Sequence, residues 1–193
     1  MHGYAWFLLP LAYFLGGISP GYWLVRLRTG TDVRTLGSGA TGATNAARAL
    51  GRGGFALVLA LDATKGALAC VLARVAGMDG GWEFAAATAV VAGHVWPVQL
   101  GFRGGRGLGP LLGAWLVLAP LAIGVCLVAA GLIWAGSRRR IMAGLFGTLL
   151  LPVATWWQTH SPHSAALTAA TSAIVLFAHR SYWLPRNVSH PHT

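Results

Sequence analysis

Six long apolar stretches, separated by short polar segments, constrain this chain more than any other feature. They occupy approximately residues 4–25, 55–76, 84–100, 108–135, 141–157 and 165–178. An α-helix of about 20 apolar residues spans the hydrocarbon core of a bilayer. Charged residues make up only 9% of the 193 residues, whereas a soluble domain has about 25%. The sequence therefore predicts one all-α domain, residues 1–193, that forms a polytopic integral membrane protein.

Pro120 decides the number of spans. Proline interrupts the hydrogen bonding of a helix interior, so residues 108–135 form either one long helix or two shorter ones. We favour two helices, which makes about seven transmembrane helices in total. Pro10 and Pro20 are possible kinks in the first stretch. Because no Lys or Arg precedes that stretch, we interpret it as a retained span rather than a cleaved signal peptide.

The charge of the chain is strongly positive, with 14 basic residues, 4 acidic residues and a formal net charge of +10. With seven spans, nearly all arginines fall on one side of the membrane, in loops at about residues 26–53, 101–107, 136–140 and 179–193. Arginine-rich loops mark the cytoplasmic side. We therefore expect the N-terminus outside and the C-terminus in the cytoplasm. We attribute the charge to topology, membrane lipids and anionic ligands rather than to nucleic acid.

Residues 32–51, with the sequence DVRTLGSGATGATNAARALG, form the polar segment with the clearest chemical content. Glycines let the backbone turn tightly and expose its N–H groups, which suits a phosphate or another anion. Hydroxyl and amide groups add neutral hydrogen bonds, and arginine adds fixed positive charge. The candidate ligand-binding residues are Gly37, Ser38, Gly39, Thr41, Gly42, Thr44, Asn45 and Arg48.

A second glycine-rich segment precedes the stretch that begins at about residue 108. It contains Arg103, Gly104, Gly105, Arg106 and Gly107. Glycines before a helix, the unpaired N–H groups of the helix N-terminus and two arginines together favour phosphate binding. The segment lacks the spacing and the Lys-Ser/Thr ending of a P-loop. The alternative is a basic interfacial loop that only sets topology and contacts lipid headgroups.

Four of the ionisable residues within or at the ends of the apolar stretches are candidates for a functional role. Asp62 and Lys65 are three residues apart, so they share a face of one helix and are expected to pair. Such a pair either braces the helix bundle or borders a substrate pocket, and we favour a supporting role. His94 is a packing, interfacial or proton-handling residue, and His179 ends the last stretch.

No metal site is expected from the sequence. Neither His94 nor His179 has a Ser-His-Asp or metal-ligand spacing. Cys70 and Cys126 lie inside apolar stretches without metal-ligand spacing, so we expect two buried thiols.

Taken in order, these motifs resemble the bacterial acyl-phosphate:glycerol-3-phosphate acyltransferase family, which is membrane-integral. The resemblance covers nearly the whole chain, from the loop at residues 37–45 through Arg48, Asp62 with Lys65, Gly93-His94, Trp96-Pro97-Val98 and residues 102–107 to Arg138 and His179-Arg180. It implies transfer of a fatty acyl group from acyl-phosphate to the 1-hydroxyl of glycerol 3-phosphate, which yields lysophosphatidic acid and phosphate. It also implies a site that faces the cytoplasm at the bacterial inner membrane and that needs no cofactor.

The resemblance also assigns roles to residues. It implies that Ser38, Arg48, Arg106 and His179 surround the two substrates as catalytic residues. Gly104, Gly105 and Gly107 are expected to hold the phosphate of the acyl donor, with Arg103 and Arg138 as further substrate-binding residues. Asp62, Lys65 and His94 support them. Because acyl-phosphate is already activated, no covalent acyl-enzyme is expected, and Ser38 orients substrate rather than attacking it.

The chain departs from the family pattern at several positions. Ala40 and Tyr182 stand where the family usually has Asn, and Arg103 and Arg106 stand where it has Lys. A small or hydroxylated stretch is replaced by Leu108-Gly109-Pro110. Because two amides are missing from the pattern, a second interpretation is a paralogue that uses another polyol phosphate or acyl donor. A binding or transport protein for an anionic lipid or phosphate ester is a third interpretation, since intramembrane charges suit a solute path.

Overall fold

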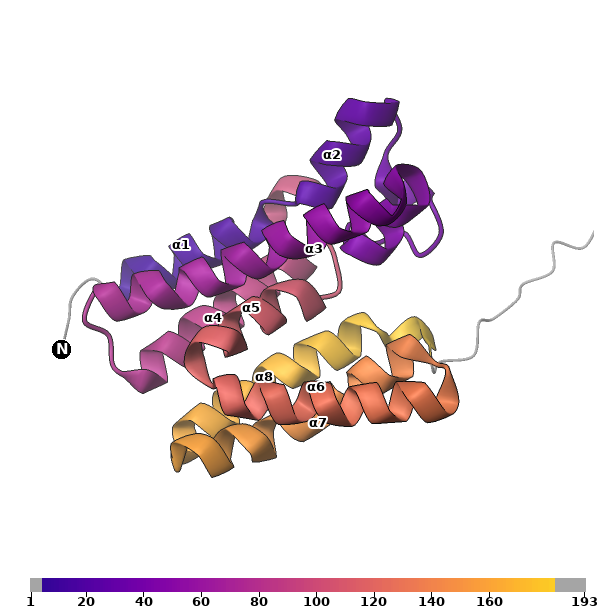
Figure 1. The fold of residues 1–193 in the computed structure, drawn as a ribbon. Helices are drawn as coiled ribbons and strands as arrows, with labels where there is room; N and C mark the ends of the chain where they lie inside the picture. Colours follow the sequence, from indigo (N-terminus) through magenta and orange to yellow (C-terminus); the bar gives the residue numbers. More distant parts are fainter. Residues whose placement is uncertain (1–4, 183–193) are drawn as a thin grey trace, which may run out of the picture.

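The computed structural model describes residues 5–182, and within this range the chain is helical and contains no β-strand. The predicted all-α fold is therefore confirmed. Figure 1 shows the helices in chain order. Eight α-helices and three short 3₁₀ helices are present in the described range: α1 (Ala5–Gly17), α2 (Pro20–Thr29), η1 (Val33–Thr35), α3 (Ala43–Val75), α4 (Gly80–Val95), η2 (Val98–Leu100), α5 (Leu108–Leu118), α6 (Pro120–Ser137), α7 (Arg140–Thr159), α8 (Pro162–Ala178) and η3 (Arg180–Tyr182).

The helices form two groups that pack against each other (Figure 1). In the first group α3 packs against α5 and α1 packs against α4. In the second group α7 lies between α6 and α8, and the contact of α8 with α4 joins the groups. The chain passes from one group to the other at Pro120.

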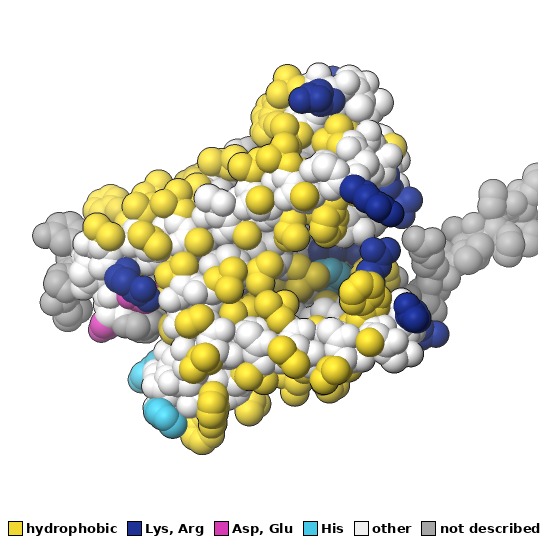
Figure 2. Space-filling view, in the orientation of Figure 1, with side chains coloured by type: hydrophobic (Ala, Val, Ile, Leu, Met, Phe, Trp, Pro, Cys, Tyr) yellow, Lys and Arg dark blue, Asp and Glu magenta, His cyan; other side chains and the backbone are white. Residues whose placement is uncertain are grey.

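The outer surface of the bundle is apolar, as expected for a protein in lipid. In the part of the chain that the structure describes, four helical segments are long and apolar enough to cross a membrane, namely Phe7–Thr29, Ala43–Val75, Pro120–Ser137 and Arg140–Thr159, while α5 and α8 are shorter apolar helices. Large apolar side chains point outward, for example Phe7 and Leu132, which are 77% and 71% exposed. Figure 2 shows such side chains spread along the helices. The chain is an integral membrane protein with several membrane helices.

Proline and glycine place the helix breaks. Pro20 is the first residue of α2, after a break at residues 18–19, whereas Pro10 lies inside α1. Pro120 is the first residue of α6, and only Ala119 separates α6 from α5. The favoured interpretation of residues 108–135 as two helices is therefore confirmed. Gly51, with φ of 66° and ψ of −163°, breaks α3, so its apolar part begins close to the expected residue 55.

Part of the segment that was expected to be a loop at residues 26–53 is helical. α2 continues to Thr29 and η1 follows, with the side chain of Asp32 accepting a hydrogen bond from the Arg34 N–H. Helix α3 then begins at Ala43, because the following residues are rich in alanine, the best helix former. The loop between α2 and α3, residues 30–42, is called the first loop below. The second loop connects α4 to α5 and comprises residues 96–107.

Positive charge gathers at one end of the bundle. Both loops, the turn between α6 and α7 and the end of α8 lie at this end, which we call the arginine-rich end (Figures 1 and 2). At the opposite end Arg74 forms an ion pair with Glu83 at 3.0 Å. The grouping of arginines that the sequence predicts is thus present in the fold, and the assignment of this end to the cytoplasm stays a prediction.

Small residues bring α3 and α5 into backbone contact. A β-carbon at Gly66 would collide with the carbonyl of Pro110, and one at Gly113 would collide with the carbonyl of Ala63. Close approach through small residues is the usual way in which membrane helices pack. This contact fixes the N-terminus of α5 beside Asp62, whose Cβ would lie 2.7 Å from a β-carbon at Gly109.

Candidate active site

The first loop folds around the side chain of Asn45, which is 2% exposed. Its amide nitrogen lies 2.8, 2.9 and 2.9 Å from the carbonyl oxygens of Val33, Leu36 and Ala40. Its amide oxygen accepts the N–H of Ser38 at 3.2 Å. The amide of Asn45 therefore holds the loop together, and its predicted role in binding substrate stays a prediction.

The second loop is anchored to the end of α4. The N–H groups of Gly104 and Gly105 donate to the carbonyls of Val95 and His94 at 3.2 and 2.9 Å. A β-carbon at Gly104 or Gly105 would collide with atoms of His94. These two glycines are needed for close backbone approach, and their N–H groups are already used within the protein.

The two loops are bonded directly to each other. The Thr41 N–H donates to the Gly104 carbonyl at 3.1 Å, and Arg34 Nη1 donates to the Leu100 carbonyl at 3.0 Å. Arg34 also forms an ion pair with Asp32 at 2.7 Å. The hydrogen bonds from Arg34 hold the pKa of the Asp32 carboxyl below its ordinary value. Arg34 is therefore a structural link between the loops.

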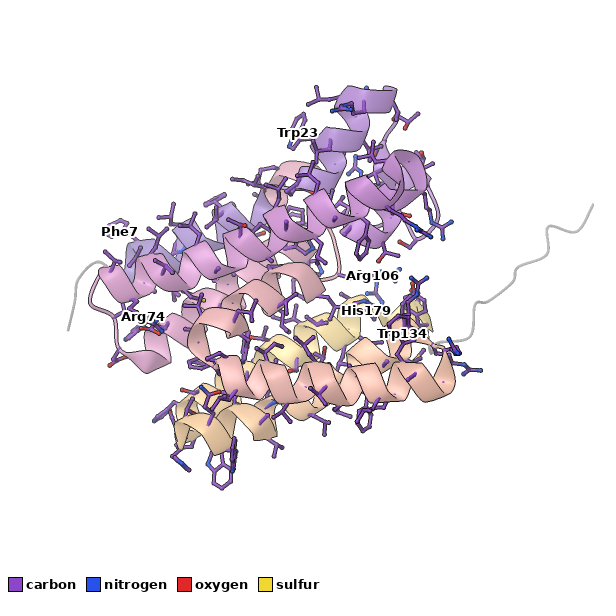
Figure 3. The ribbon with its side chains drawn as sticks, in the orientation of Figure 1. Phe7, Trp23, Arg74, Arg106, Trp134 and His179 are labelled. Carbon is purple, nitrogen blue, oxygen red and sulfur yellow. The ribbon has the colours of Figure 1, made fainter. Side chains whose placement is uncertain are left out.

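A cavity of about 220 Å³ opens at the arginine-rich end between these loops and the ends of α3, α5, α7 and α8. All four side chains that the sequence singled out as catalytic line it. Figure 3 shows two of them, Arg106 and His179, close to each other at this end of the bundle. The polar lining comprises Ser38, Thr44, Asn45, Arg48, Asp62, His94, Arg106, His179 and Tyr182.

Two helix N-termini also open into the cavity. Gly42 and Thr44 at the start of α3, and Gly107 and Gly109 at the start of α5, are among the lining residues. The first N–H groups of a helix have no partner within the helix, and the helix dipole adds partial positive charge there. Gly107 has φ of 87°, a left-handed conformation that suits glycine. Two such termini at one cavity provide N–H donors and partial positive charge of the kind that suits an anion.

The two arginines of the cavity are not neutralised by acidic side chains. In the described part of the chain, Arg48 has no hydrogen-bonding or ionic partner, and its guanidinium packs against the backbone of Gly37. The Arg106 guanidinium lies 4.8 Å from the centre of the Tyr182 ring and 3.4 Å from Ser181 Oγ. Both positive charges are therefore available to an anionic ligand.

His179 is 4% exposed and lies one residue beyond the end of α8. Its Nδ1 is 2.8 Å from the carbonyl oxygen of Val175. Because a carbonyl only accepts, Nδ1 carries the proton and Nε2 has a free lone pair. Burial lowers the pKa of His179, and Arg106 lowers it further against the opposing effect of the Val175 hydrogen bond. The imidazole is therefore neutral at pH 7 and accepts hydrogen bonds at Nε2.

Asp62, Lys65 and His94 form a buried network next to the cavity. Lys65 Nζ lies 2.9 Å from Asp62 Oδ1 and 2.8 Å from His94 Nδ1. It also donates to the carbonyls of Gly16 and Ile18 at 2.8 and 2.7 Å, at the break between α1 and α2. The expected pairing of Asp62 with Lys65 is confirmed. The sequence did not predict that His94, 29 residues farther along, joins the pair.

Some candidates lie away from this cavity. Arg103, Gly104 and Gly105 line a neighbouring groove that shares Ser38, Ala40 and Arg106 with it. Arg138, at the turn between α6 and α7, is exposed and lines neither space. The buried thiols of Cys70 and Cys126 are free, as expected.

The apolar wall of the cavity was missed in the sequence. It comprises Phe55, Leu59, Leu108 and Ile141. These residues have no distinguishing signal, because ordinary membrane helices are made of the same residue types.

Comparisons with known proteins identify the family of this chain. A family model described as "Glycerol-3-phosphate acyltransferase" matches residues 6–184. The chain belongs to the glycerol-3-phosphate acyltransferase family.

Individual relatives match over nearly their whole length. Glycerol-3-phosphate acyltransferase 1 of Desulfitobacterium hafniense is 41% identical over 174 residues, which cover 90% of this chain and 86% of that protein. Glycerol-3-phosphate acyltransferase of Anaeromyxobacter dehalogenans is 40% identical over 180 residues, or 90% of this chain and 89% of the relative.

Two crystal structures have the same fold. Both are of PlsY (YgiH), described as an integral membrane glycerol 3-phosphate acyltransferase. Its glycerol 3-phosphate form has a TM-score of 0.86 at 30% identity, covering 93% of this chain and 90% of that one. Its lysophosphatidic acid form has a TM-score of 0.83 at 29% identity, with the same coverage.

Ala40 and Tyr182, the two positions where the resemblance led us to expect an amide, both line the cavity. Ala40 is buried and lines the cavity, and its carbonyl accepts the Asn45 amide. The Tyr182 ring lies against Arg106 and 6.0 Å from the ring centre of His179. The departures thus alter the surroundings of the arginine and the histidine rather than a remote surface.

Proposed function

We propose that this protein transfers a fatty acyl group from acyl-phosphate to the 1-hydroxyl of glycerol 3-phosphate, producing lysophosphatidic acid and inorganic phosphate. The observation that supports it most is the convergence of two helix N-termini, Arg48, Arg106 and neutral His179 on one cavity. Both substrates carry a phosphate group, so a site with two unpaired cations and two helix N-termini matches their charge. Membership of the acyltransferase family supports the same substrates.

The geometry suggests a direct transfer. Nε2 of His179 accepts a hydrogen bond from the 1-hydroxyl, whose oxygen attacks the acyl carbonyl carbon. The carbonyl carbon–oxygen bond to phosphate then breaks, and phosphate leaves with the bonding electron pair. The hydroxyl proton passes to His179 and from there to the leaving phosphate. Arg48, Arg106 and the helix N-termini hold the anionic groups and stabilise the charge that develops during transfer.

Ser38 is placed at the cavity to orient substrate. Among residues 5–182 its only hydrogen bond is a backbone one, from its N–H to Asn45, so no side chain is positioned to activate its hydroxyl. Acyl-phosphate is an activated mixed anhydride, and the transfer requires no acyl-serine intermediate and no cofactor. Thr44 and the backbone around Gly42 and Gly107 contribute further donors to the phosphate groups.

The apolar wall suits the fatty acyl group. Phe55 and Leu59 come from α3 and Ile141 from α7, so the wall lies where the cavity meets the membrane-embedded helices. We further propose that the protein resides in a bacterial inner membrane with its arginine-rich end in the cytoplasm, since arginine-rich loops remain on that side. Water-soluble glycerol 3-phosphate then enters from the cytoplasm and the acyl donor from the lipid.

A test is an assay of purified protein in nanodiscs with acyl-phosphate and glycerol 3-phosphate, following release of phosphate and formation of lysophosphatidic acid. We expect product with the wild type and a loss of at least about 100-fold in Arg106→Ala, since a charged contact to the phosphate groups of the substrates is removed. Arg139→Ala is the matched control, because Arg139 is exposed at the same end and lines neither cavity nor groove. Wild-type activity no higher than that of Arg106→Ala would refute the proposal.

Arg48 offers a second readout in the same assay. Arg48→Ala is expected to raise the KM for glycerol 3-phosphate by more than Arg48→Lys does, because lysine keeps the charge. Equal activity of both variants and the wild type would remove Arg48 from the site.

A second candidate is a paralogue that uses another polyol phosphate, and the positions of Ala40 and Tyr182 in the cavity wall favour considering it. A panel of phosphorylated polyols as acceptors tests it. Higher kcat/KM with an acceptor other than glycerol 3-phosphate would favour the paralogue.

A further inference from the structure

The cavity contains a second buried histidine, His94, which is 4% exposed. It has no role in the transfer described above. Its two ring nitrogens have different surroundings, and these surroundings determine which nitrogen carries the proton.

Nδ1 of His94 faces the ammonium group of Lys65. The distance from Nδ1 to Lys65 Nζ is 2.8 Å, while that to Asp62 Oδ1 is 3.4 Å. An ammonium group has only donors, so at the shorter distance Nδ1 must accept. In a neutral imidazole the other nitrogen then carries the proton. Lys65 therefore sets His94 in the form that donates from Nε2.

Nε2 of His94 faces the second loop. A β-carbon at Gly105 would collide with this atom, and the Gly105 N–H donates to the His94 carbonyl at 2.9 Å. Within residues 5–182, no hydrogen-bonding partner occupies Nε2. The loop thus lies directly against an imidazole nitrogen that no described protein group uses and that belongs to a cavity-lining residue.

We propose that His94 is a substrate-binding residue whose Nε2–H donates to a phosphate oxygen held against the second loop, and that Lys65 is the positioning residue that fixes this tautomer. The proposal rests on the proposed function for the identity of that phosphate as the one of the acyl donor. His179 presents the opposite form, with Nδ1 donating to Val175 and Nε2 accepting. The cavity thereby offers one imidazole donor for an anionic oxygen and one imidazole acceptor for a hydroxyl.

Two variants separate this role from packing. In His94→Asn the amide oxygen takes the place of Nδ1 and accepts from Lys65, but the shorter side chain does not reach Gly105. In His94→Gln the amide nitrogen reaches the position of Nε2. Inorganic phosphate is the probe, measured by its protection against thermal unfolding in detergent and by competitive inhibition against acyl-phosphate. Ser172→Ala, a buried hydroxyl on α8 that donates to the Thr148 carbonyl, is a control for general core damage.

We expect His94→Asn to weaken phosphate binding about tenfold and to raise the KM for acyl-phosphate by a similar factor, the usual effect of losing one hydrogen bond to a charged group. His94→Gln is expected to recover most of the phosphate affinity and most of the wild-type KM. In both variants we expect kcat to change less than KM. Phosphate binding by His94→Asn as tight as that of the wild type, or no recovery in His94→Gln, would overturn the proposal.

A second measurement does not depend on the folding of any variant. NMR of wild-type protein with ¹⁵N-labelled histidine reports directly which ring nitrogen carries the proton. We expect Nε2–H for His94 and Nδ1–H for His179, and an Nδ1–H tautomer at His94 would overturn the assignment. Phosphate binding that depends on His94 in a protein without acyl transfer would refute the proposed function and leave the role of His94 intact.

Discussion

Replacing Lys65 with methionine tests whether the buried network of Asp62, Lys65 and His94 holds the bundle together. Lys65 is 5% exposed and its ammonium contacts four groups from three different helices and the α1–α2 break. Methionine has a similar length and fills the same space without a donor. The substitution therefore removes the donors and leaves the carboxylate of Asp62 buried without its cation.

The structure predicts an asymmetry between the two partners of the ion pair. Removing one partner of a buried pair costs about 3–5 kcal/mol of unfolding free energy, and Lys65→Met is expected at the upper end because two carbonyls at the end of α1 also lose their donor. In Asp62→Asn the ammonium keeps three neutral acceptors, so we expect a cost of about 1–2 kcal/mol. The double variant Asp62→Asn/Lys65→Met contains no unpaired charge and is expected to be more stable than Lys65→Met alone.

Equilibrium unfolding in mild detergent measures these differences, with the intrinsic fluorescence of the 9 tryptophans as the signal. Arg139→Ala, an exposed change outside the network, is the control and is expected to lie within about 0.5 kcal/mol of the wild type. A decrease in unfolding free energy in Asp62→Asn as large as that in Lys65→Met would refute the predicted asymmetry between the two partners. A double variant no more stable than Lys65→Met would show that the unpaired carboxylate carries no cost.

Three further predictions concern the cavity. Asn45→Ala removes the amide that holds the first loop, so activity is expected to fall at least about tenfold with a loss of about 2 kcal/mol in unfolding free energy; Thr44→Ala, an exposed neighbour, is the stability control. Tyr182→Phe keeps an aromatic ring on Arg106 and is expected to retain activity, whereas Tyr182→Ala is expected to raise the KM for acyl-phosphate about three- to fivefold. A KM for Tyr182→Ala equal to that of the wild type would contradict this prediction. Burial lowers the pKa of His179, so its neutral, accepting form persists below the ordinary imidazole pKa of about 6.5. We therefore expect kcat/KM to fall with decreasing pH only below pH 6.5. A fall in kcat/KM that begins above pH 6.5 would exclude His179 as the acceptor.

Much of the fold follows from local sequence properties. In lipid, a helix is the way for an apolar segment to satisfy its own backbone hydrogen bonds, so six apolar stretches already specify helices. Pro20 and Pro120 are the first residues of helices, because proline fits the first helical turn better than any later position in a helix. The polar segments between the stretches pointed to several of the residues that line the cavity, among them Ser38, Arg48 and Arg106. Arginine is costly within lipid and is suited, together with exposed backbone N–H groups, to an anion.

What each polar group contacts was not available from the sequence. Asn45 has the hydrogen-bonding capacity of a substrate ligand, but the fold turns its amide to the carbonyls of its own loop. Gly104 and Gly105 have the composition of a phosphate loop, but their N–H groups are bonded to the end of α4. A motif specifies which groups are present, while the partner of each group depends on the packing of distant segments.

The sequence alone thus determined that this protein is a helical membrane protein with an arginine-rich end, because hydrophobicity, proline and charge act locally along the chain. Only the tertiary structure decided that Lys65 faces His94 and that His179 faces Val175. The first contact joins α3 to α4, and close helix approach through small residues makes such contacts possible. Hydrogen-bond direction, and with it the donor or acceptor character of each imidazole, arises from these contacts and not from any spacing in the sequence.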